Sequence, residues 1–142
     1  MQLCKYTHFL IAPSSWEADP LLYRRHRFAE YLQNRDDTRT VVWVSPCRSS
    51  SIRPNIILRE LSNGILQMDV PDWKGLSKHL RYRTTQLKRS IVDIWHRDPS
   101  AVPMLWYTYP AFFHVSRMEG WDKVVYDCSD MGSEADTHRN SV

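Results

Sequence analysis

The sequence predicts an α/β fold in which helices cover a doubly wound, mostly parallel sheet. Short, nearly uninterrupted apolar runs occur along the chain, and such runs are typical of strands buried on both faces. Segments with helical periodicity separate these runs, and strands that alternate with helices pair in parallel. The chain has 142 residues, of which 42% are hydrophobic, and this is enough for one domain with a single core.

Four of the apolar runs predict core strands, and a further region predicts a small hairpin. The core runs are Tyr6–Ala12, Thr40–Ser45, Val102–Tyr107 and Lys123–Asp127. Ile56–Glu60 and Ile65–Val70 flank Asn63-Gly64, a dipeptide typical of tight turns between antiparallel strands. We expect this second pair to form a small excursion or an edge pairing of the sheet.

Three segments predict helices. Asp19-Pro20 supplies an N-cap and a first-turn proline for a helix that should end near Asn34. A long helix is expected over Lys74–Trp95 and a short one over Ala111–Met118. The long helix has an apolar stripe for the core, made of Leu76, Leu80, Leu87, Ile91 and Ile94. Its separate basic stripe is either a solvated face or a contact for an anionic membrane surface, and it consists of Lys74, Lys78, Arg81 and Lys88.

Composition narrows the range of functions. A net charge of only +3 argues against a nucleic-acid partner. The three cysteines lack CxxC spacing, which predicts free thiols and neither a disulfide framework nor a metal site. No signal-peptide pattern opens the chain, and no apolar run approaches the roughly 20 residues that span a bilayer. We therefore expect a cytoplasmic protein with one domain over residues 1–130 and a frayed tail over 131–142.

The loop after the first strand is a candidate binding site for an anion such as phosphate. In doubly wound sheets, ligands lie beyond the carboxyl ends of the strands. Ser14, Ser15, Trp16 and Glu17 follow the first strand, where backbone N–H groups and the helix dipole favour an anion. The two serines could also serve only to make the turn. The loop has no glycine, so the GxGxxG pattern of NAD-dependent dehydrogenases is missing.

Two further side chains are candidates at the same edge of the sheet. His26 lies one turn after Leu22, where it is either a hydrogen-bonding base in the crevice or a structural histidine. Trp106 and Tyr107 are assigned to packing, whereas Tyr109 lies in the loop that follows them. An aromatic ring with a hydroxyl tip suits a sugar, which presents C–H patches between its hydroxyl groups.

Two aspartates at the end of the last core strand are the candidates for catalysis. Asp127 and Asp130 are three residues apart, so both can face one crevice. An inverting sugar transfer needs a carboxylate that accepts the proton of the acceptor hydroxyl. Asp130 has an equally good alternative role as the cap of a following helix. Cys128, between them, is more typical of a small buried side chain than of a nucleophile.

Three segments resemble one enzyme family in their order and spacing. The segments are HFLIAPSSWEADPLLYRRHRFAEYL from His8, WYTYP at Trp106–Pro110 and WDKVVYDCSD at Trp121–Asp130. They are similar to the N-terminal half of bacterial glycosyltransferases of teichuronic acid synthesis. The resemblance covers most of Thr7–Asp130 and is weakest between Arg48 and Ser100.

The resemblance implies a Rossmann-like domain, the acceptor-side half of a two-domain GT-B glycosyltransferase. In that family the second domain holds most of the donor, a nucleotide sugar such as a UDP-sugar, and no cofactor is implied within this chain. The implied acceptor is a lipid-linked glycan at the inner face of the cell membrane. Relatives continue past Asp130 into the second domain, so we expect this chain to lack that domain and to be inactive alone. The alternative is a non-catalytic, truncated α/β module that binds a partner or nothing.

Overall fold

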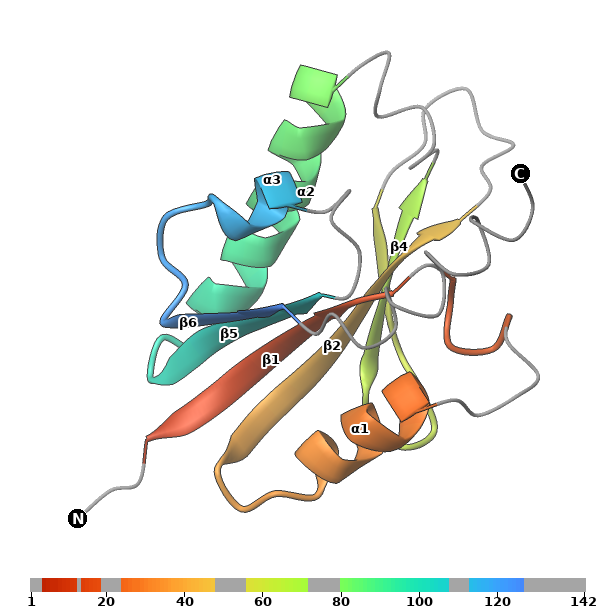
Figure 1. Ribbon diagram of the computed structural model, residues 1–142, viewed down its shortest axis with the longest axis vertical. Helices are drawn as coiled ribbons and strands as arrows, with labels where there is room; N and C mark the ends of the chain where they lie inside the picture. Colours follow the sequence, from red (N-terminus) through yellow and green to blue (C-terminus); the bar gives the residue numbers. More distant parts are fainter. Residues whose placement is uncertain are drawn as a thin grey trace, which may run out of the picture.

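A six-stranded sheet forms the centre of the molecule in the computed structural model, which describes residues 4–12, 14–18, 24–47, 56–71, 80–107 and 113–126 (Figure 1). The strands are β1 (Lys5–Ile11), β2 (Thr38–Cys47), β3 (Ile57–Glu60), β4 (Leu66–Pro71), β5 (Ala101–Tyr107) and β6 (Lys123–Tyr126). Their order in the sheet is β3-β4-β2-β1-β5-β6, and each pairing is parallel except that of β3 with β4. The predicted α/β class with a mostly parallel, Rossmann-like sheet is confirmed.

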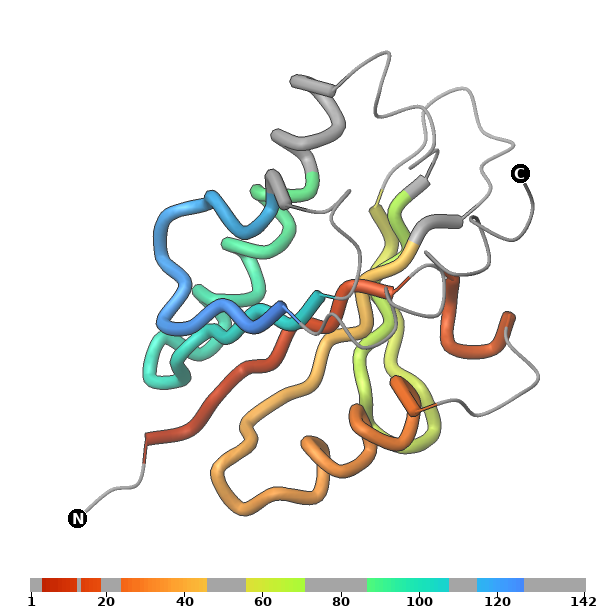
Figure 2. The backbone as a smooth tube through the Cα atoms, viewed as in Figure 1, coloured from red at the N-terminus to blue at the C-terminus, as the bar shows by residue number. Residues whose placement is uncertain are grey.

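Helices cover the two faces of the sheet. The backbone tube passes from β1 through α1 (Arg24–Gln33) to β2 on one face, and α2 (Leu80–Arg97) lies on the other (Figure 2). The short α3 (Phe113–Ser116) connects β5 to β6 on the same side as α2. Among the helices that the structure describes, none is both long and apolar enough to cross a membrane.

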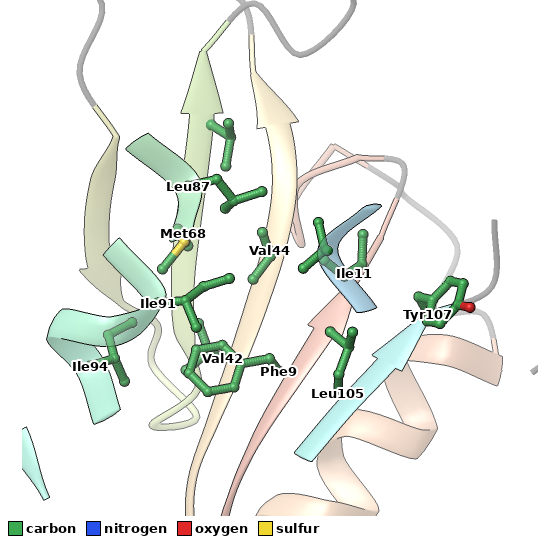
Figure 3. Close-up of a cluster of buried hydrophobic side chains, with 12 residues drawn as sticks. Phe9, Ile11, Val42, Val44, Met68, Leu87, Ile91, Ile94, Leu105 and Tyr107 are labelled. Carbon is green, nitrogen blue, oxygen red and sulfur yellow. The ribbon is translucent and has the colours of Figure 1, made fainter. Parts of the chain in front are cut away.

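The side chains of each strand alternate between two cores because neighbouring residues of a strand point to opposite faces. Phe9 and Ile11 of β1 pack with Leu87, Ile91 and Ile94 of α2 (Figure 3). These three α2 residues are part of the predicted apolar stripe, and their burial confirms that part of it. Leu10 and Ala12 turn to the opposite face, where they pack with Ala29 and Leu32 of α1 and with Trp43 of β2.

The predicted hairpin exists, but its second strand lies inside the sheet. Gly64 has φ +87° in the turn between β3 and β4, a conformation that glycine adopts without strain. β3 is the edge strand of the sheet, so the expected edge pairing is formed by β3 and β4, and β4 also pairs in parallel with β2 on its other side. Gln67 and Asp69 alternate with apolar residues in β4, and this pattern is typical of a half-exposed strand. In the folded protein, Gln67 is fully buried and hydrogen-bonded, which reconciles the alternation with an interior position.

Some predictions lie partly or wholly outside the described residues. The expected first-helix start at Asp19-Pro20 is among them, although α1 ends at Gln33, beside the expected end at Asn34. Of the basic stripe, Lys74 and Lys78 lie outside the described residues, the side chain of Arg81 is not described, and Lys88 is exposed on α2. The expected tail over residues 131–142 also lies outside the described part of the chain.

Candidate functional site

The carboxyl ends of β1 and β5 lie at the point where the direction of the strand order reverses. After β1 the chain moves to β2 on one side, and after β4 it returns through α2 to β5 on the other side of β1. The connections that follow β1 and β5 therefore diverge. In open α/β sheets, ligands bind in the crevice that this divergence creates.

The loop after β1 is held in place by hydrogen bonds from three other elements. The indole Nε1 of Trp43 in β2 donates to the carbonyl oxygen of Ser14 over 2.9 Å. The backbone N–H of Trp16 donates to Oε1 of Gln67 in β4 over 3.0 Å. His26 of α1 places Nε2 at 3.1 Å from the carbonyl oxygen of Trp16, and since a carbonyl only accepts, Nε2 carries the proton.

The rings of the same residues pack against one another behind the loop. The Trp16 ring meets His26 at a centroid distance of 4.5 Å and Trp43 at 5.0 Å, both edge to face. His26 and Trp43 are buried, with centroids 4.7 Å apart. The hydrogen bond to Trp16 and this packing make His26 a structural support of the loop, and its use as a base stays a prediction.

Glu17, at the end of the loop, is part of an ion-pair network. Arg59 of β3 binds both carboxylate oxygens of Glu17, with Nη2 at 2.8 Å from Oε2, and its Nε donates to Asp69 of β4 over 2.9 Å. The hydrogen bonds from Arg59 lower the pKa of the Glu17 carboxyl below its ordinary value. Glu17 is therefore an ionised anchor for the loop, and a carboxylate in this state repels phosphate.

Ser14 and Ser15 are the two residues of the loop that carry hydroxyl groups. Both side chains are partly exposed, and neither hydroxyl makes a hydrogen bond within the part of the chain that the structure describes. The backbone around them is fixed by Trp43, Gln67 and His26. The two hydroxyls therefore lie on a rigid loop and can bind a polar ligand at little cost in conformational entropy.

A cavity of about 560 Å³ opens where α1 begins and where β1, β5 and β6 end. From α1 it is lined by Arg24, Arg25, Arg27 and Phe28. The strands contribute residues that include Leu10, Trp106, Tyr107 and Tyr126. Its volume falls within the range of small-molecule sites, and it combines an apolar wall with a few polar groups, as such sites do.

Trp106 forms the wall of this cavity and also has a buried polar partner. Its ring meets that of Phe28 edge to face at a centroid distance of 4.8 Å. Its Nε1 donates to Nδ1 of His8 over 3.0 Å. Burial lowers the pKa of His8 to about 4, so this imidazole is neutral at pH 7 and accepts the bond from the indole. Trp106 was assigned to packing from the sequence, and the structure adds its place in the cavity wall.

The structure brings some of the predicted site residues together and does not describe others. Ser14, Ser15, Trp16 and Glu17 share one loop, and His26 supports it. Tyr109, Asp127 and Asp130 lie outside the described residues, although Tyr107 and Tyr126, which line the cavity, precede them closely in the chain. The arginines of α1 line the cavity only because α1 lies beside the ends of β5 and β6 in the folded protein.

The chain is 31% identical over 142 residues to a protein of Bacillus subtilis (strain 168) described as "Putative teichuronic acid biosynthesis glycosyltransferase TuaH". The chain is a homologue of TuaH. The match covers 95% of this chain and 35% of TuaH, so the chain spans about a third of the length of this relative. Neither a protein-family model nor a solved structure matches the chain.

Homology to TuaH supports the resemblance to teichuronic acid glycosyltransferases that the sequence motifs indicated. The mostly parallel α/β sheet is consistent with a Rossmann-like glycosyltransferase domain. Within the described residues, no group of three or more His, Cys, Asp or Glu side chains could hold a metal ion.

Proposed function

We propose that the chain forms the acceptor-binding part of a GT-B glycosyltransferase that builds teichuronic acid or another anionic cell-wall polysaccharide. The observation that carries the proposal is the cavity at the switch point of a TuaH homologue. Its aromatic wall of Phe28 and Trp106 suits the C–H face of a sugar ring. The proposed acceptor is a lipid-linked glycan, and the proposed donor is a nucleotide sugar such as a UDP-sugar.

In the proposed reaction, an acceptor hydroxyl oxygen attacks the anomeric carbon of the donor sugar. The bond from that carbon to the phosphate oxygen breaks, and the nucleoside diphosphate leaves with the bonding electrons. The hydroxyl proton passes to a carboxylate, for which Asp130 and Asp127 are the proposed candidates because they follow β6 directly in the chain. The rigid loop with Ser14 and Ser15 would bind hydroxyl or phosphate groups of the substrates at the same edge.

Binding measurements on the purified chain test the division of labour in this proposal. We expect the chain to bind a lipid-linked glycan acceptor in detergent micelles and to bind a UDP-sugar at least about tenfold more weakly, a difference of roughly 1.4 kcal/mol. The reason is that the family places most of the nucleotide contacts in its second domain. Tight binding of the UDP-sugar together with no binding of the acceptor would overturn the proposal.

A chimera tests the chemistry. The chain replaces the matching part of TuaH, and teichuronic acid is measured in a B. subtilis strain that lacks TuaH and in the same strain with the chimera. We expect the chimera to restore synthesis and Asp130→Asn or Asp127→Asn to lower it by about 100-fold, the effect typical of losing a general base. Normal synthesis with both Asn substitutions present would exclude the two aspartates as the base.

A further inference from the structure

A second cavity, of about 280 Å³, lies beside the same helix as the first but toward the other end of the sheet. It is lined by Tyr6 and His8 of β1, by residues from the last turn of α1 and by the residues at the start of β6. Phe28 and Trp106 line both cavities. The proposed transfer reaction is assigned to the carboxyl ends of the strands, so this second cavity has no role in it.

Five rings follow one another along the wall of the second cavity. The ring of His8 lies 5.9 Å from that of Tyr6 and 6.0 Å from that of Trp106, measured between centroids. Beyond Trp106 the row continues to Phe28 at 4.8 Å and from there to Tyr31 at 6.4 Å. All five residues line the cavity. A continuous aromatic wall favours a ring-shaped ligand that packs its C–H face against it.

The imidazole in this row has a hydrogen-bond donor without a partner. Nδ1 of His8 accepts a hydrogen bond from Trp106, and the imidazole is neutral, so its proton is on Nε2. The His8 side chain is only 3% exposed, and within the described part of the chain Nε2 has no hydrogen-bond partner. A buried donor that lacks an acceptor costs free energy. An acceptor atom of a ligand in the cavity would remove that cost.

The charges in the lining of the second cavity cancel. Arg35 binds the two carboxylate oxygens of Asp37 over 2.8 and 3.0 Å, and its Nη1 donates to the hydroxyl of Tyr31 over 3.0 Å. The other two charged residues of the lining, Asp122 and Lys123, are of opposite sign. The lining therefore has no excess of either charge and favours a neutral ligand over an ion.

Among neutral groups, a hydroxyl fits the polar side of this cavity best. A hydroxyl accepts a hydrogen bond from an imidazole N–H and at the same time donates its own proton to a carboxylate. The carboxylate of Asp37 lines the cavity together with His8 and is close enough for its charge to act on the imidazole. The hydrogen bonds from Arg35 lower the pKa of Asp37, so this carboxylate is ionised and accepts hydrogen bonds at neutral pH.

We propose that the second cavity binds a neutral ring with several hydroxyl groups, of the chemical class of a neutral sugar unit, and that one hydroxyl bonds both Nε2 of His8 and Asp37. The C–H face of the ring packs on the aromatic row. This site goes beyond the proposed function, which places the acceptor in the first cavity and requires no second one. A free monosaccharide and a sugar unit within a glycan chain offer the same chemistry.

Nuclear magnetic resonance of the ¹⁵N-labelled chain at pH 7 tests the site directly, because the imidazole signals of His8 report on Nε2. The probes are methyl glucoside, a neutral glucose trisaccharide and methyl glucuronide. We expect a saturable shift of the His8 Nε2 signal with one or both neutral probes, and their comparison distinguishes a free sugar from a unit within a chain. Methyl glucuronide should bind at least about threefold more weakly than methyl glucoside, because its carboxylate loses water without gaining a free cation.

The Tyr6→Ala substitution removes one ring from the second cavity and leaves His8 in place as the reporter. Tyr6 does not line the first cavity, so the acceptor site is unchanged. We expect the midpoint of the His8 titration to rise about fivefold in sugar concentration, the effect of losing one aromatic contact. Ile57→Ala is the matched control, because Ile57 is a large, 57% exposed side chain of β3 outside both cavities. Thermal unfolding of both variants confirms that the fold is kept.

Three results would overturn the proposal. The first is a His8 signal that stays unchanged with both neutral probes up to about 100 mM, which would mean that water alone satisfies Nε2. The second is a response to methyl glucuronide at lower concentration than to methyl glucoside, and the third is an equal loss in the Tyr6 and Ile57 variants. Binding of the lipid-linked acceptor is measured separately, so the proposed function and the second site can fail independently.

Discussion

At the residue scale, one buried amide connects the loop of the candidate site to the interior of the sheet. The Gln67 side chain accepts a hydrogen bond from the backbone N–H of Trp16 and donates one to Oγ of Ser45 over 2.8 Å. It has no exposed surface, so neither bond is in competition with water. A buried polar side chain is tolerated only when it is satisfied in this way. The amide therefore fixes the backbone beside Ser14 and Ser15.

The Gln67→Leu substitution should destabilise the protein and loosen the loop. It leaves the Trp16 N–H and the Ser45 hydroxyl without these partners, which costs about 1–3 kcal/mol of the free energy of unfolding in urea. Gln33→Leu is the matched control, because Oε1 of Gln33 is buried without a hydrogen-bond partner among the described residues. We expect the control to be near neutral. Equal losses in the two variants would show that the amide does not support the loop.

The buried imidazole of His8 should make stability depend on pH. Burial lowers its pKa from 6.5 to about 4 in the folded protein, so between these values the unfolded chain binds more protons. The free energy of unfolding is therefore highest, as far as His8 is concerned, above pH 6.5. It falls by about 2–3 kcal/mol as the pH drops to 4. Glu17, Asp37 and Asp98 have lowered pKa values, so their contributions are lost only below their ordinary pKa near 4.

Replacing His8 by glutamine isolates this contribution. His8→Gln keeps an acceptor for Nε1 of Trp106 but cannot titrate. The free energy of unfolding of the wild-type protein minus that of the variant should therefore decrease steadily from pH 7 to pH 4. Urea unfolding at four or more pH values measures it. Parallel pH profiles for the two proteins would mean that His8 does not carry the effect.

Part of the candidate site could be predicted from the sequence, because strand ends and loops can be located without knowing the fold. Ser14 to Glu17 directly follow an apolar run, so their place at a strand end can be predicted from the sequence. The residues that hold the loop cannot be predicted in this way, since Gln67 is separated from Trp16 by 51 positions. The arginine-lined cavity was equally hidden, because its walls come from α1, β5 and β6, and only parallel pairing around β1 brings those elements together.

At the element scale, strands were located well from the sequence, and the turn signal at Asn63-Gly64 predicted the β3–β4 hairpin but not the second pairing of β4, which is with β2. Apolar runs placed β1, β2, β5 and β6 within a few residues of their observed bounds. Gln67 and Asp69 interrupt the apolar pattern of β4, although β4 lies between β3 and β2 in the sheet. Asp69 pairs with Arg59 of β3, and Gln67 binds the first loop. Both polar residues thus serve contacts that a one-dimensional pattern cannot show.

Two glycines at element junctions should respond differently to alanine. Gly64 and Gly120 have φ of +87° and +111°, so each Ala variant is strained in its backbone. A Cβ on Gly64 would lie 2.9 Å from Nε2 of Gln33, the movable end of a side chain. A Cβ on Gly120 would lie 2.6 Å from the Trp95 ring, which itself packs against Phe9 and Trp121.

We therefore expect Gly64→Ala to cost about 1 kcal/mol of the free energy of unfolding, mainly through backbone strain. Gly120→Ala should cost about 2–4 kcal/mol, because the strain adds to overpacking against a ring that cannot move aside. Urea unfolding measures both, and the near-ultraviolet circular dichroism of tryptophan should change only for Gly120→Ala. A smaller cost at Gly120 than at Gly64 would contradict this view of the Trp95 contact.

At the scale of the whole molecule, the sheet separates two surfaces with different proposed partners. α1 lies on one face of the sheet and α2 on the other (Figure 1). The arginine-lined cavity lies between α1 and the carboxyl ends of β1, β5 and β6, and Lys88 is exposed on α2. If the basic stripe of the long helix binds an anionic membrane, the cavity is not covered by that contact. Membrane binding and saccharide binding should then be independent of each other, which makes them separable by substitution.

Vesicle sedimentation tests the membrane contact and this independence together. We expect the chain to bind vesicles that contain anionic lipid, to bind neutral vesicles weakly, and to dissociate as salt is raised.

Each basic residue near an anionic surface contributes about 1 kcal/mol, so Lys88→Gln should lower the partition coefficient roughly fivefold. Lys123→Gln is the matched control, since Lys123 is an exposed lysine of β6 outside the stripe. Arg27→Gln should leave vesicle binding unchanged, because Arg27 lies on the opposite face of the sheet. Equal binding to neutral and anionic vesicles, or equal losses at Lys88 and Lys123, would exclude the long helix as an electrostatic membrane contact.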